Sequence, residues 1–191
     1  MSFGKHGYPR HVILKDGSEV VLRPMEPLSD EQALADFFAR VPENDRWYLV
    51  DDVSDPELVR AWARTVDPKR VLPILAMREG GVVAALATLH RYTHGARAHI
   101  GRIRLVVDAA HRSQRLGTYL LMDLIQLAVE VGLRLLQVEL IRGVDDRAIR
   151  AAGRLDFFEQ AVVPDYARDP RGNRYDLVFM IKRIHRGYDD F

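Results

Sequence analysis

A strand, a short basic turn and an amphipathic helix follow one another without interruption over residues 105–131, and no other part of the chain constrains the fold as strongly. The strand is the apolar run at residues 105–107. In the helix, apolar residues recur at spacings of three and four, which predicts one face packed against a sheet. This face comprises Leu120, Leu121, Leu124, Ala128 and Val131, and the residues placed away from it are Asp123, Gln126 and Glu130.

The turn between the strand and the helix has the features of an anion-binding site. The first N–H groups of a helix have no partners within it, and the aligned peptide dipoles place about half a positive charge there. Arg112 and Arg115 add full charges, and Gly117 has no side chain to keep a ligand from the backbone. A pyrophosphate would fit such a turn. Two solvated arginines with no ligand are the alternative interpretation.

These residues resemble the acetyl-CoA loop of the GNAT superfamily of N-acetyltransferases, which reads Arg/Gln-x-x-Gly-x-Gly/Ala after a valine-rich strand. Here residues 112–117 read Arg-Ser-Gln-Arg-Leu-Gly, with Arg115 in place of the first family glycine. The order of elements from about residue 20 to about residue 181 is also similar to that of the family. The resemblance implies that acetyl-CoA, as acyl donor, is bound by Leu105, Val106, Val107, Arg112, Ser113, Gln114, Arg115, Leu116, Gly117 and Thr118.

The first part of the chain predicts a hairpin and two helices. Two β-prone runs at residues 11–14 and 19–22 flank an Asp-Gly turn, which favours a hairpin. Residues 29–32, Ser-Asp-Glu-Gln, predict a capping box that opens a helix ending near Pro42. Residues 54–57, Ser-Asp-Pro-Glu, predict the start of a second helix.

The rest of the chain predicts six strands, the amphipathic helix and a second, shorter helix. Gly132 is placed to end the amphipathic helix, and a helical crossover makes the strands on either side of it parallel. Asp145 or Asp146 can cap the shorter helix. The expected strands lie at residues 71–77, 82–89, 100–107 and 135–141 and around residues 161–163 and 175–181.

This succession resembles the order of elements in the acetyltransferase family. The fold class we expect is α/β (mixed α+β), with a GNAT-like central mixed, mostly antiparallel sheet flanked by helices. The length suits a single acetyltransferase-like domain over residues 1–191, with short N-terminal and C-terminal tails.

The resemblance implies an N-acetyltransferase that moves an acetyl group from acetyl-CoA to a primary amine. In the family, backbone N–H groups of the strand before the loop contact the donor, which fills a gap like a missing strand. N–H donors stabilise the developing oxyanion, and the fold holds the two reactants in register. An ammonium must also lose a proton, and the departing sulfur must gain one or be stabilised.

The proton donor that many family members use has no counterpart in this chain. Their pattern resembles Asn-x-x-Ala-x-x-x-Tyr, and here Asp145 replaces the asparagine and Ala152 the tyrosine. Tyr166 or Tyr175 could donate from the late strands, although tyrosines there are more often packed amphipathic residues.

Two residues are candidates for the base. Glu139 lies on the strand after the amphipathic helix, and His99 comes just before the strand that leads to the loop. Glu139 could instead pair with Arg142 or Arg150, and His99 could be an exposed strand end. Arg102 occupies a place where relatives carry a glutamate.

Composition excludes several function classes. The 28 basic and 27 acidic residues give a net charge of +1, so no global field attracts nucleic acid or an anionic membrane. The absence of cysteine removes disulfides and thiolate metal sites, and we predict no metal. No apolar run approaches the roughly 20 residues that span a bilayer, and no signal peptide is visible. A cytoplasmic location is the default expectation.

Two other functions stay open. A catalytically silent CoA-binding regulatory or interaction domain would explain Ala152 and Arg115. A nucleic-acid-binding module would use the basic residues 182–186, although a solvated tail accounts for them as well and we expect no nucleic-acid partner.

The acceptor would be a small-molecule amine or a protein amine. Asp51, Asp52 and Asp165 could attract it, or they could serve as helix caps and solvated loop charges. The late strands offer a sheet edge through which two copies could pair, so a homodimer is possible.

Overall fold

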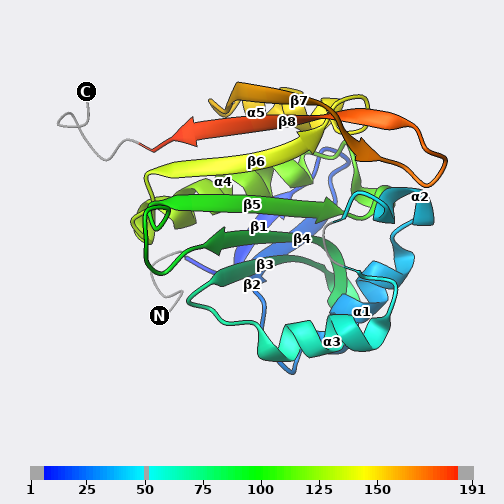
Figure 1. Ribbon diagram of the computed structural model, residues 1–191. Helices are drawn as coiled ribbons and strands as arrows, with labels where there is room; N and C mark the ends of the chain where they lie inside the picture. The colour runs from blue at the N-terminus through cyan, green and yellow to red at the C-terminus, as the bar shows by residue number, and fades with distance from the viewer. Residues whose placement is uncertain (1–6, 50–51, 185–191) are drawn as a thin grey trace. The chain divides into compact units, whose positions relative to one another are not determined.

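The computed structural model describes residues 7–49 and 52–184 (Figure 1). The predicted strands and helices are present, together with a four-residue helix and two short 3-10 turns that the sequence did not predict. The strands are β1 Arg10–Ile13, β2 Glu19–Pro24, β3 Val71–Arg78, β4 Val82–Arg91, β5 Ile100–Val107, β6 Leu135–Ile141, β7 Phe158–Arg168 and β8 Arg174–Arg183, the helices are α1 Glu31–Arg40, α2 Glu43–Arg46, α3 Pro56–Thr65, α4 Leu116–Glu130 and α5 Asp146–Gly153, and the 3-10 turns are η1 Glu79–Gly81 and η2 Ala109–His111.

The strands form one eight-stranded sheet in the order β1-β2-β3-β4-β5-β6-β8-β7. The β1–β2, β2–β3, β6–β8 and β7–β8 pairs are antiparallel. The β5–β6 pair, which α4 connects, is parallel as predicted for a helical crossover. The predicted mixed, mostly antiparallel sheet flanked by helices is therefore confirmed.

The chain divides into two compact units. The first unit comprises Met1–Thr88 and Leu105–Leu120, and the second comprises Leu89–Arg104 and Leu121–Phe191. The loop predicted to bind acetyl-CoA belongs to the first unit, and the candidate catalytic residues belong to the second. The single domain expected over residues 1–191 stays a prediction.

In the first unit, α1 and α3 lie side by side (Figure 1) and share an apolar core. Phe37 and Phe38 project from α1 with their rings edge to face, 5.1 Å apart between centroids. Val59 and Ala63 on α3, one turn apart, are buried in the same core, as the helical spacing predicts. This core fixes α1, from whose end a side chain reaches the candidate loop.

The capping box predicted at residues 29–32 is wrong, although the helix it announced is present. Asp30 occupies the N-cap position, but its side chain makes no capping hydrogen bond. The carboxylate instead accepts two hydrogen bonds from Arg23, of 2.6 and 2.7 Å, and one of 2.7 Å from the backbone N–H of Glu26. A paired, charge-assisted contact is stronger than a neutral cap, so the carboxylate turns toward Arg23.

We predict that Asp30→Asn lowers the free energy of unfolding by about 2 kcal/mol at pH 7, because the change removes charge-assisted hydrogen bonds from a buried pair. Burial raises the pKa of Asp30, but the hydrogen bonds and charge of Arg23 and the Glu26 N–H outweigh it and lower the pKa below its usual value. The carboxylate therefore stabilises the fold above about pH 4 and loses that effect as pH falls through its lowered pKa. Urea unfolding of both proteins should show a difference that shrinks in acid, and a difference constant down to pH 2 would contradict the assignment.

The position predicted for Asp123 is also wrong, because only 4% of this residue is exposed. Asp123 follows Leu120 by three residues and precedes Leu127 by four, so the helical spacing places all three on one face. Gln126 and Glu130 are exposed, as predicted. Helix α4 ends as expected at Gly132, whose φ is 85°.

In the second unit, β6, β8 and β7 form an antiparallel group, and β7 is one of the two edge strands of the sheet. Strand β7 is longer than the predicted run at residues 161–163. One face of this group carries the buried Leu136, Val178 and Met180. Because successive side chains alternate between faces, the polar side chains of β6 lie on the opposite face.

Asp145, one of the two predicted caps, occupies the N-cap position of α5, the helix after β6. The Asp145 side chain makes no capping bond to this helix and accepts a 2.8 Å hydrogen bond from the backbone N–H of Ile141. The Asp146 carboxylate accepts one of 2.9 Å from Gly143. Both carboxylates therefore stabilise the turn that leads from β6 into α5.

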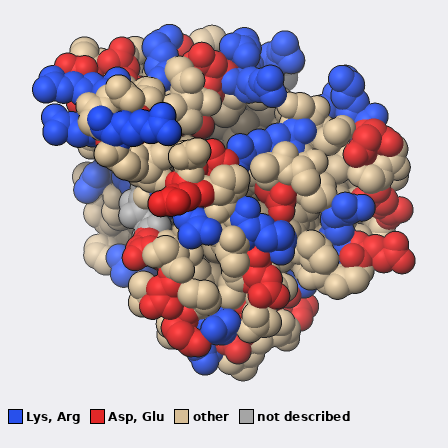
Figure 2. All heavy atoms as spheres, turned by 90° about the vertical axis from the view of Figure 1, so that its right-hand side faces the viewer, with Lys and Arg blue, Asp and Glu red and all other residues tan. Residues whose placement is uncertain are grey.

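Charged side chains of both signs are interspersed on the face drawn in Figure 2, in keeping with the net charge of +1. None of the helices in the described part of the chain is long and apolar enough to cross a membrane. The described residues also contain no group of three or more His, Asp or Glu side chains that could hold a metal ion. The cytoplasmic location stays a prediction.

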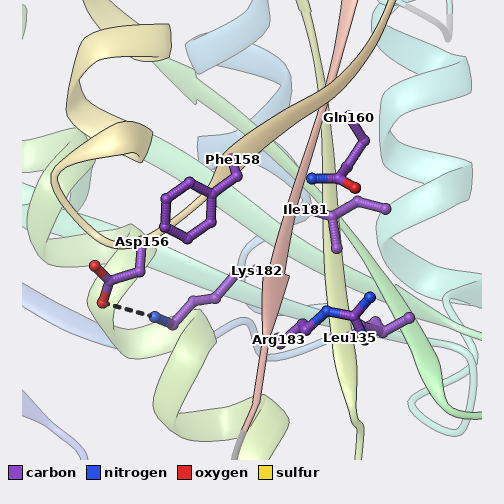
Figure 3. Close-up of a pocket in the computed structure, with 7 residues that line it drawn as sticks. All are labelled: Leu135, Asp156, Phe158, Gln160, Ile181, Lys182 and Arg183. Carbon is purple, nitrogen blue, oxygen red and sulfur yellow. Dashed lines mark hydrogen bonds and ion pairs between the residues drawn. The ribbon is translucent and has the colours of Figure 1, made fainter.

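A pocket of about 330 Å³ opens on the second unit and contains none of the predicted site residues (Figure 3). On one side of it, Lys182 donates a 2.9 Å hydrogen bond to the carbonyl of Leu155 and lies 3.3 Å from the Asp156 carboxylate. Its lining consists of Leu135, Asp156, Phe158, Gln160, Ile181, Lys182 and Arg183.

Candidate active site

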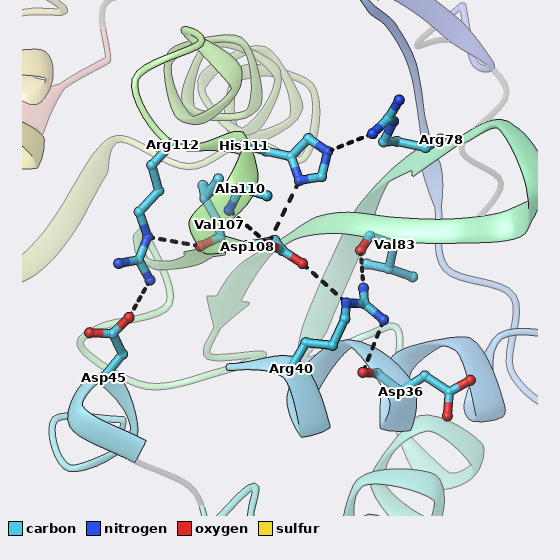
Figure 4. Close-up of polar contacts among 10 residues, drawn as sticks. All are labelled: Asp36, Arg40, Asp45, Arg78, Val83, Val107, Asp108, Ala110, His111 and Arg112. Carbon is cyan, nitrogen blue, oxygen red and sulfur yellow. Dashed lines mark hydrogen bonds and ion pairs between the residues drawn. The ribbon is translucent and has the colours of Figure 1, made fainter. Parts of the chain in front are cut away.

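A carboxylate fixes the start of the predicted cofactor loop, in the first unit (Figure 4). Asp108 follows β5 and caps η2, because its Oδ1 accepts a 2.9 Å hydrogen bond from the N–H of Ala110. Its Oδ2 accepts a 3.2 Å bond from Arg40, and Arg40 also donates to the carbonyl of Val83 at 2.8 Å. Burial raises the pKa of Asp108, but these hydrogen bonds and the Arg40 charge hold it below its usual value. Helix α1 is thereby tied to the loop.

Arg112, predicted to bind a phosphate, is engaged by the protein itself. Its Nε donates a 3.2 Å hydrogen bond to the carbonyl of Val107, and a terminal nitrogen lies 2.6 Å from the carboxylate of Asp45 on α2 (Figure 4). The Arg112 side chain is still 41% exposed. The sequence analysis did not predict a role for Asp45, because Asp45 lies in a helix of four residues, which is too short to show a hydrophobic periodicity.

His111 completes this network. Its Nε2 lies 3.2 Å from a terminal nitrogen of Arg78, and because a guanidinium has only donors, Nε2 is the acceptor. Its Nδ1 lies 3.8 Å from the Asp108 carboxylate (Figure 4). This separation is too long for a hydrogen bond, and Nδ1 has no hydrogen-bond partner in the described part of the chain, so the ring is tied to the protein through Nε2 and Arg78 on β3.

The backbone of the loop keeps the shape that glycine favours, although glycine is absent. Arg115 has a φ of 68° and Ser113 a φ of 64°, both in the left-handed region. That conformation costs a residue with a side chain about 1 kcal/mol, which explains a glycine in the family pattern. The Arg115 carbonyl accepts a 3.1 Å hydrogen bond from Tyr119 and so begins α4.

The Arg115 side chain differs from that of Arg112 in its polar contacts. It is exposed, and within residues 7–49 and 52–184 its guanidinium has no polar partner. Of the two arginines in the predicted loop, Arg115 therefore carries the charge that is available to a ligand.

Gly117 lies in the first turn of α4, where a side chain would have room within the protein. An added Cβ would meet Leu105 Cδ2 at 3.5 Å and Val107 Cγ2 at 3.8 Å, both ordinary contacts. The absence of a side chain is therefore not required by packing. It leaves the N–H groups of the first helical turn open to close approach.

We predict that Gly117→Val weakens acetyl-CoA binding by at least about tenfold, or 1.4 kcal/mol, because the added methyl groups occupy the approach to the N–H groups. The melting temperature without ligand should not fall in Gly117→Ala, since the contacts of an added Cβ to Leu105 and Val107 are ordinary. Calorimetric titration with acetyl-CoA measures the affinity, and Gly117→Ala, which the family pattern allows, is the matched control. Unchanged affinity in Gly117→Val would place the donor elsewhere.

The end of β5 is positioned to offer backbone groups. The parallel ladder between β5 and β6 ends at the pair of Ile103 and Val138, whereas β5 itself continues to Val107. Leu105, Val106 and Val107 are half-buried, and Val106 packs against the core of α1 and α3. Their side chains therefore pack in the protein. Their peptide groups lie beyond the last residue of β5 that pairs with β6.

Glu139, the candidate base in the second unit, is held by two neighbours. Its Oε1 accepts a 2.8 Å hydrogen bond from Gln137 and lies 3.4 Å from Nε of Arg102 on β5. Within the described part of the chain Oε2 has no polar partner, and the side chain is 28% exposed. The alternative pairing with Arg142 is wrong, because Arg142 lies 2.8 Å from Glu159.

The structure does not bring His99 to Glu139. His99 precedes β5, is exposed, and its carbonyl accepts hydrogen bonds from Arg134 and Leu135. Leu135 and Glu139 are separated by four residues of β6, which at the rise of a strand is about 13 Å. The side chain of Gln137, by contrast, is on the same face as that of Glu139 and contacts it.

The two candidate tyrosines differ in their surroundings. Tyr166 on β7 is 64% exposed and has no polar partner among the described residues. Tyr175 donates a 3.2 Å hydrogen bond to Asp169, and burial together with that bond raises the pKa of its hydroxyl. Strand β8 lies between β7 and β6 in the sheet, so Tyr166 is two strands away from Glu139.

The predicted acceptor-attracting aspartates are not gathered into a cluster. Asp51 lies outside the described residues. Asp52 accepts hydrogen bonds from the N–H and hydroxyl of Ser54 in the first unit, and Asp165 pairs with Arg174 at 3.3 Å in the second. His185 and Arg186 of the basic run at residues 182–186 also lie outside the described part of the chain.

The chain matches the acetyltransferase (GNAT) family over residues 32–157, which is more than half of its length. The protein belongs to this family. Its members are acyltransferases that use acetyl-CoA as acyl donor, so this chain is an acyltransferase with acetyl-CoA as its donor. No curated protein matches the chain.

Solved structures show the same fold. The acetyltransferase of GNAT family from Streptococcus pneumoniae is 21% identical with a TM-score of 0.75, covering 86% of this chain and 99% of its own. The structure of yncA from Salmonella typhimurium, which contains its cofactor acetyl-CoA, is 20% identical with a TM-score of 0.74, covering 88% and 96%. The ribosomal-protein-alanine N-acetyltransferase from Brucella melitensis is 22% identical with a TM-score of 0.73, covering 85% and 99%.

Proposed function

We propose that this protein transfers the acetyl group of acetyl-CoA to a primary amine, and that the ten residues predicted for the donor bind it. The observation that carries the proposal is the left-handed backbone at Arg115, the position of the first family glycine. A left-handed φ disfavours residues with a side chain, and Arg115 adopts it at the position where the family pattern has glycine. This supports the proposal that the loop keeps its shape for a ligand.

The donor's pyrophosphate would lie at the start of α4. N–H groups of Leu116, Gly117 and Thr118 in the first helical turn are the natural donors to it, with the helix dipole adding attraction. Arg115 supplies a charge that no described residue neutralises. Arg112 is placed to steady the loop through Asp45 and can share its charge with the ligand.

The backbone at the end of β5 would hold the rest of the donor. Peptide groups of Leu105, Val106 and Val107 follow the last paired residue of the β5–β6 ladder, which suits a ligand that adds to the strand as another strand would. An N–H in this run is the expected donor to the oxygen that becomes negative during transfer. Ser113 and Gln114 complete the loop.

Glu139 is the base that the side-chain contacts favour. Bound acetyl-CoA supplies the thioester carbon that the amine attacks, so that a C–N bond forms and the C–S bond breaks. Glu139 takes the ammonium proton at Oε2, while Gln137 and Arg102 hold Oε1. Tyr166 would return a proton to the leaving sulfur, and His99 is the alternative base.

A silent CoA-binding domain is the second candidate function. Ala152, at the place of the family tyrosine, is 2% exposed and packed in the second unit, so α5 provides no hydroxyl there. A homodimer would use β7, an edge strand of the sheet, although Pro164 in this strand has no backbone N–H to donate. The small-molecule or protein acceptor, the homodimer and a cytoplasmic location are proposals from the sequence.

The melting temperature with and without acetyl-CoA, followed by release of free thiol with a panel of amines, tests the proposal. A ligand at about 100 times its dissociation constant adds about 2.7 kcal/mol to the free energy of unfolding. A raised melting temperature with thiol release supports the transferase. A raised melting temperature without release for any amine favours the silent domain, and no shift contradicts donor binding by this loop.

A further inference from the structure

One face of the sheet in the second unit carries a row of polar side chains next to a row of apolar ones. On β5 and β6, Arg102 is paired with Gln137, and the side chain two residues along from each points to the same face. Glu139 is therefore on this face with Arg102 and Arg104. The partner of Glu139 on β8 is Phe179.

The apolar row belongs to β8. Phe179 is paired with Glu139, and Ile181 with Gln137, so both share the face of the polar row. Both are half-buried and so keep accessible apolar surface. A ligand that contacts Glu139 would meet these two side chains on the side away from β5.

The charges of the polar row are complementary to a ligand that carries both signs. Arg102 contacts Glu139 through Nε, 3.4 Å from Oε1, and its side chain is 39% exposed. A guanidinium has five N–H donors, so the contact through Nε leaves the terminal nitrogens for another acceptor. Oε2 of Glu139 is likewise without a partner in the described part of the chain. A carboxylate oxygen that can accept a hydrogen bond from an ammonium group and a guanidinium that can donate to a carboxylate therefore lie side by side.

The row as a whole is not suited to a polycation. Arg102 and Arg104 contribute two positive charges to the face, and Glu139 contributes one negative charge. Like charges placed opposite one another disfavour binding, and this suppresses wrong partners. A polyamine or a lysine-rich peptide would bring further positive charge to the two arginines.

From these contacts we infer that the acceptor is an amine with a carboxylate close to its nitrogen and an apolar remainder, as in an apolar α-amino acid. The ammonium lies at Oε2 of Glu139, the carboxylate accepts from the terminal nitrogens of Arg102, and the apolar part contacts Phe179 and Ile181. Arg102 is then the residue that determines specificity. This inference rests on the proposed function and names the substrate class of the same site.

The decisive experiment compares amino acids with the amines that lack only their carboxylate. Leucine is paired with isoamylamine and phenylalanine with phenethylamine, and kcat/KM is measured for each by thiol release. The wild type should prefer the amino acid of each pair by about tenfold or more, as expected for a charge-assisted contact. Equal turnover of the two members, or a preference for the amine, would overturn the inference while leaving the transferase intact.

Variants locate the preference at Arg102. Arg102→Gln should lower kcat/KM for the amino acids about tenfold more than for the matched amines, mainly through KM, because both classes lose the contact of Arg102 with Glu139 but only the amino acids also lose the contact with their carboxylate. Arg102→Lys should restore part of the loss, because it keeps the charge. The matched control is Arg142→Gln, which removes another arginine–glutamate pair of this unit, the one with Glu159. Equal losses for both classes of acceptor would mean that Arg102 only supports Glu139, against the inference.

Binding separates this inference from the proposed function. With CoA present, leucine and isoamylamine are titrated calorimetrically into the protein, which needs no turnover. Tighter binding of leucine supports the inference even if no thiol is ever released, in which case the transferase proposal fails alone. Binding of neither compound, or of both equally, contradicts the inference even if other amines are acetylated.

Discussion

Glu139→Gln is expected to lower kcat by about 10²- to 10⁴-fold, the usual contribution of a general base, with the affinity for acetyl-CoA unchanged. Glutamine keeps the shape of the side chain and one oxygen for Gln137 or Arg102, but it cannot take a proton from the ammonium. Thiol release under saturating donor and acceptor measures kcat, and calorimetric titration measures donor affinity.

The control for this change is Glu159→Gln. Glu159 pairs with Arg142 at 2.8 Å, and its side chain is 41% exposed, so its replacement also removes one negative charge and one arginine contact from the second unit. It should leave kcat within about threefold of the wild type, as for a surface pair. A similar small change in Glu139→Gln would remove Glu139 from the chemistry and leave His99 as the base to test.

Gly101→Val is expected to lower the free energy of unfolding by about 3 kcal/mol, the largest effect on stability that we predict. An added Cβ would stand 2.6 Å from Leu133, 2.8 Å from Leu89 and 3.0 Å from Leu136, measured to their δ-carbons. These leucines are no more than 2% exposed and have little space into which to move. Urea unfolding measures the loss.

A glycine in open space provides the comparison. Gly153, at the end of α5, has no atom within 4 Å of an added Cβ. Gly153→Val should therefore change the free energy of unfolding by less than about 1 kcal/mol. If both variants lost the same amount, overpacking around Gly101 would not be the cause.

Periodicity predicted the regular elements well, because burial of one face is a local property of the sequence. The helix after the predicted cofactor loop, its end at Gly132 and the parallel crossover to β6 are confirmed. The cap of α1 was not predictable in the same way. Aspartate is a residue type that often caps helices, but the Asp30 carboxylate accepts hydrogen bonds from Arg23 on the preceding strand instead of from the first turn of α1.

The candidate site was predicted in its backbone more than in its side chains. A strand, a turn and a helix in direct succession place residues 105–118 without knowledge of any distant contact. The partner of Arg112 is Asp45, 67 residues earlier, and no local pattern links them. The pairing of Arg102 with Glu139 could have been predicted, since strand alternation and a parallel register place both side chains on one face of the sheet.

The arginine in a left-handed conformation at residue 115 is expected to change how the affinity for acetyl-CoA depends on ionic strength. A glycine at this position lends only peptide dipoles, whose effect is confined to the first helical turn. An unpaired guanidinium adds a monopole, which acts over a Debye length of about 10 Å in 0.1 M salt and over less as salt rises. Donor affinity in this protein should therefore fall with ionic strength, and Arg115→Gly should flatten that dependence. An arginine at this position costs backbone strain, but its charge acts over a longer distance than peptide dipoles do, and that distance depends on the salt concentration.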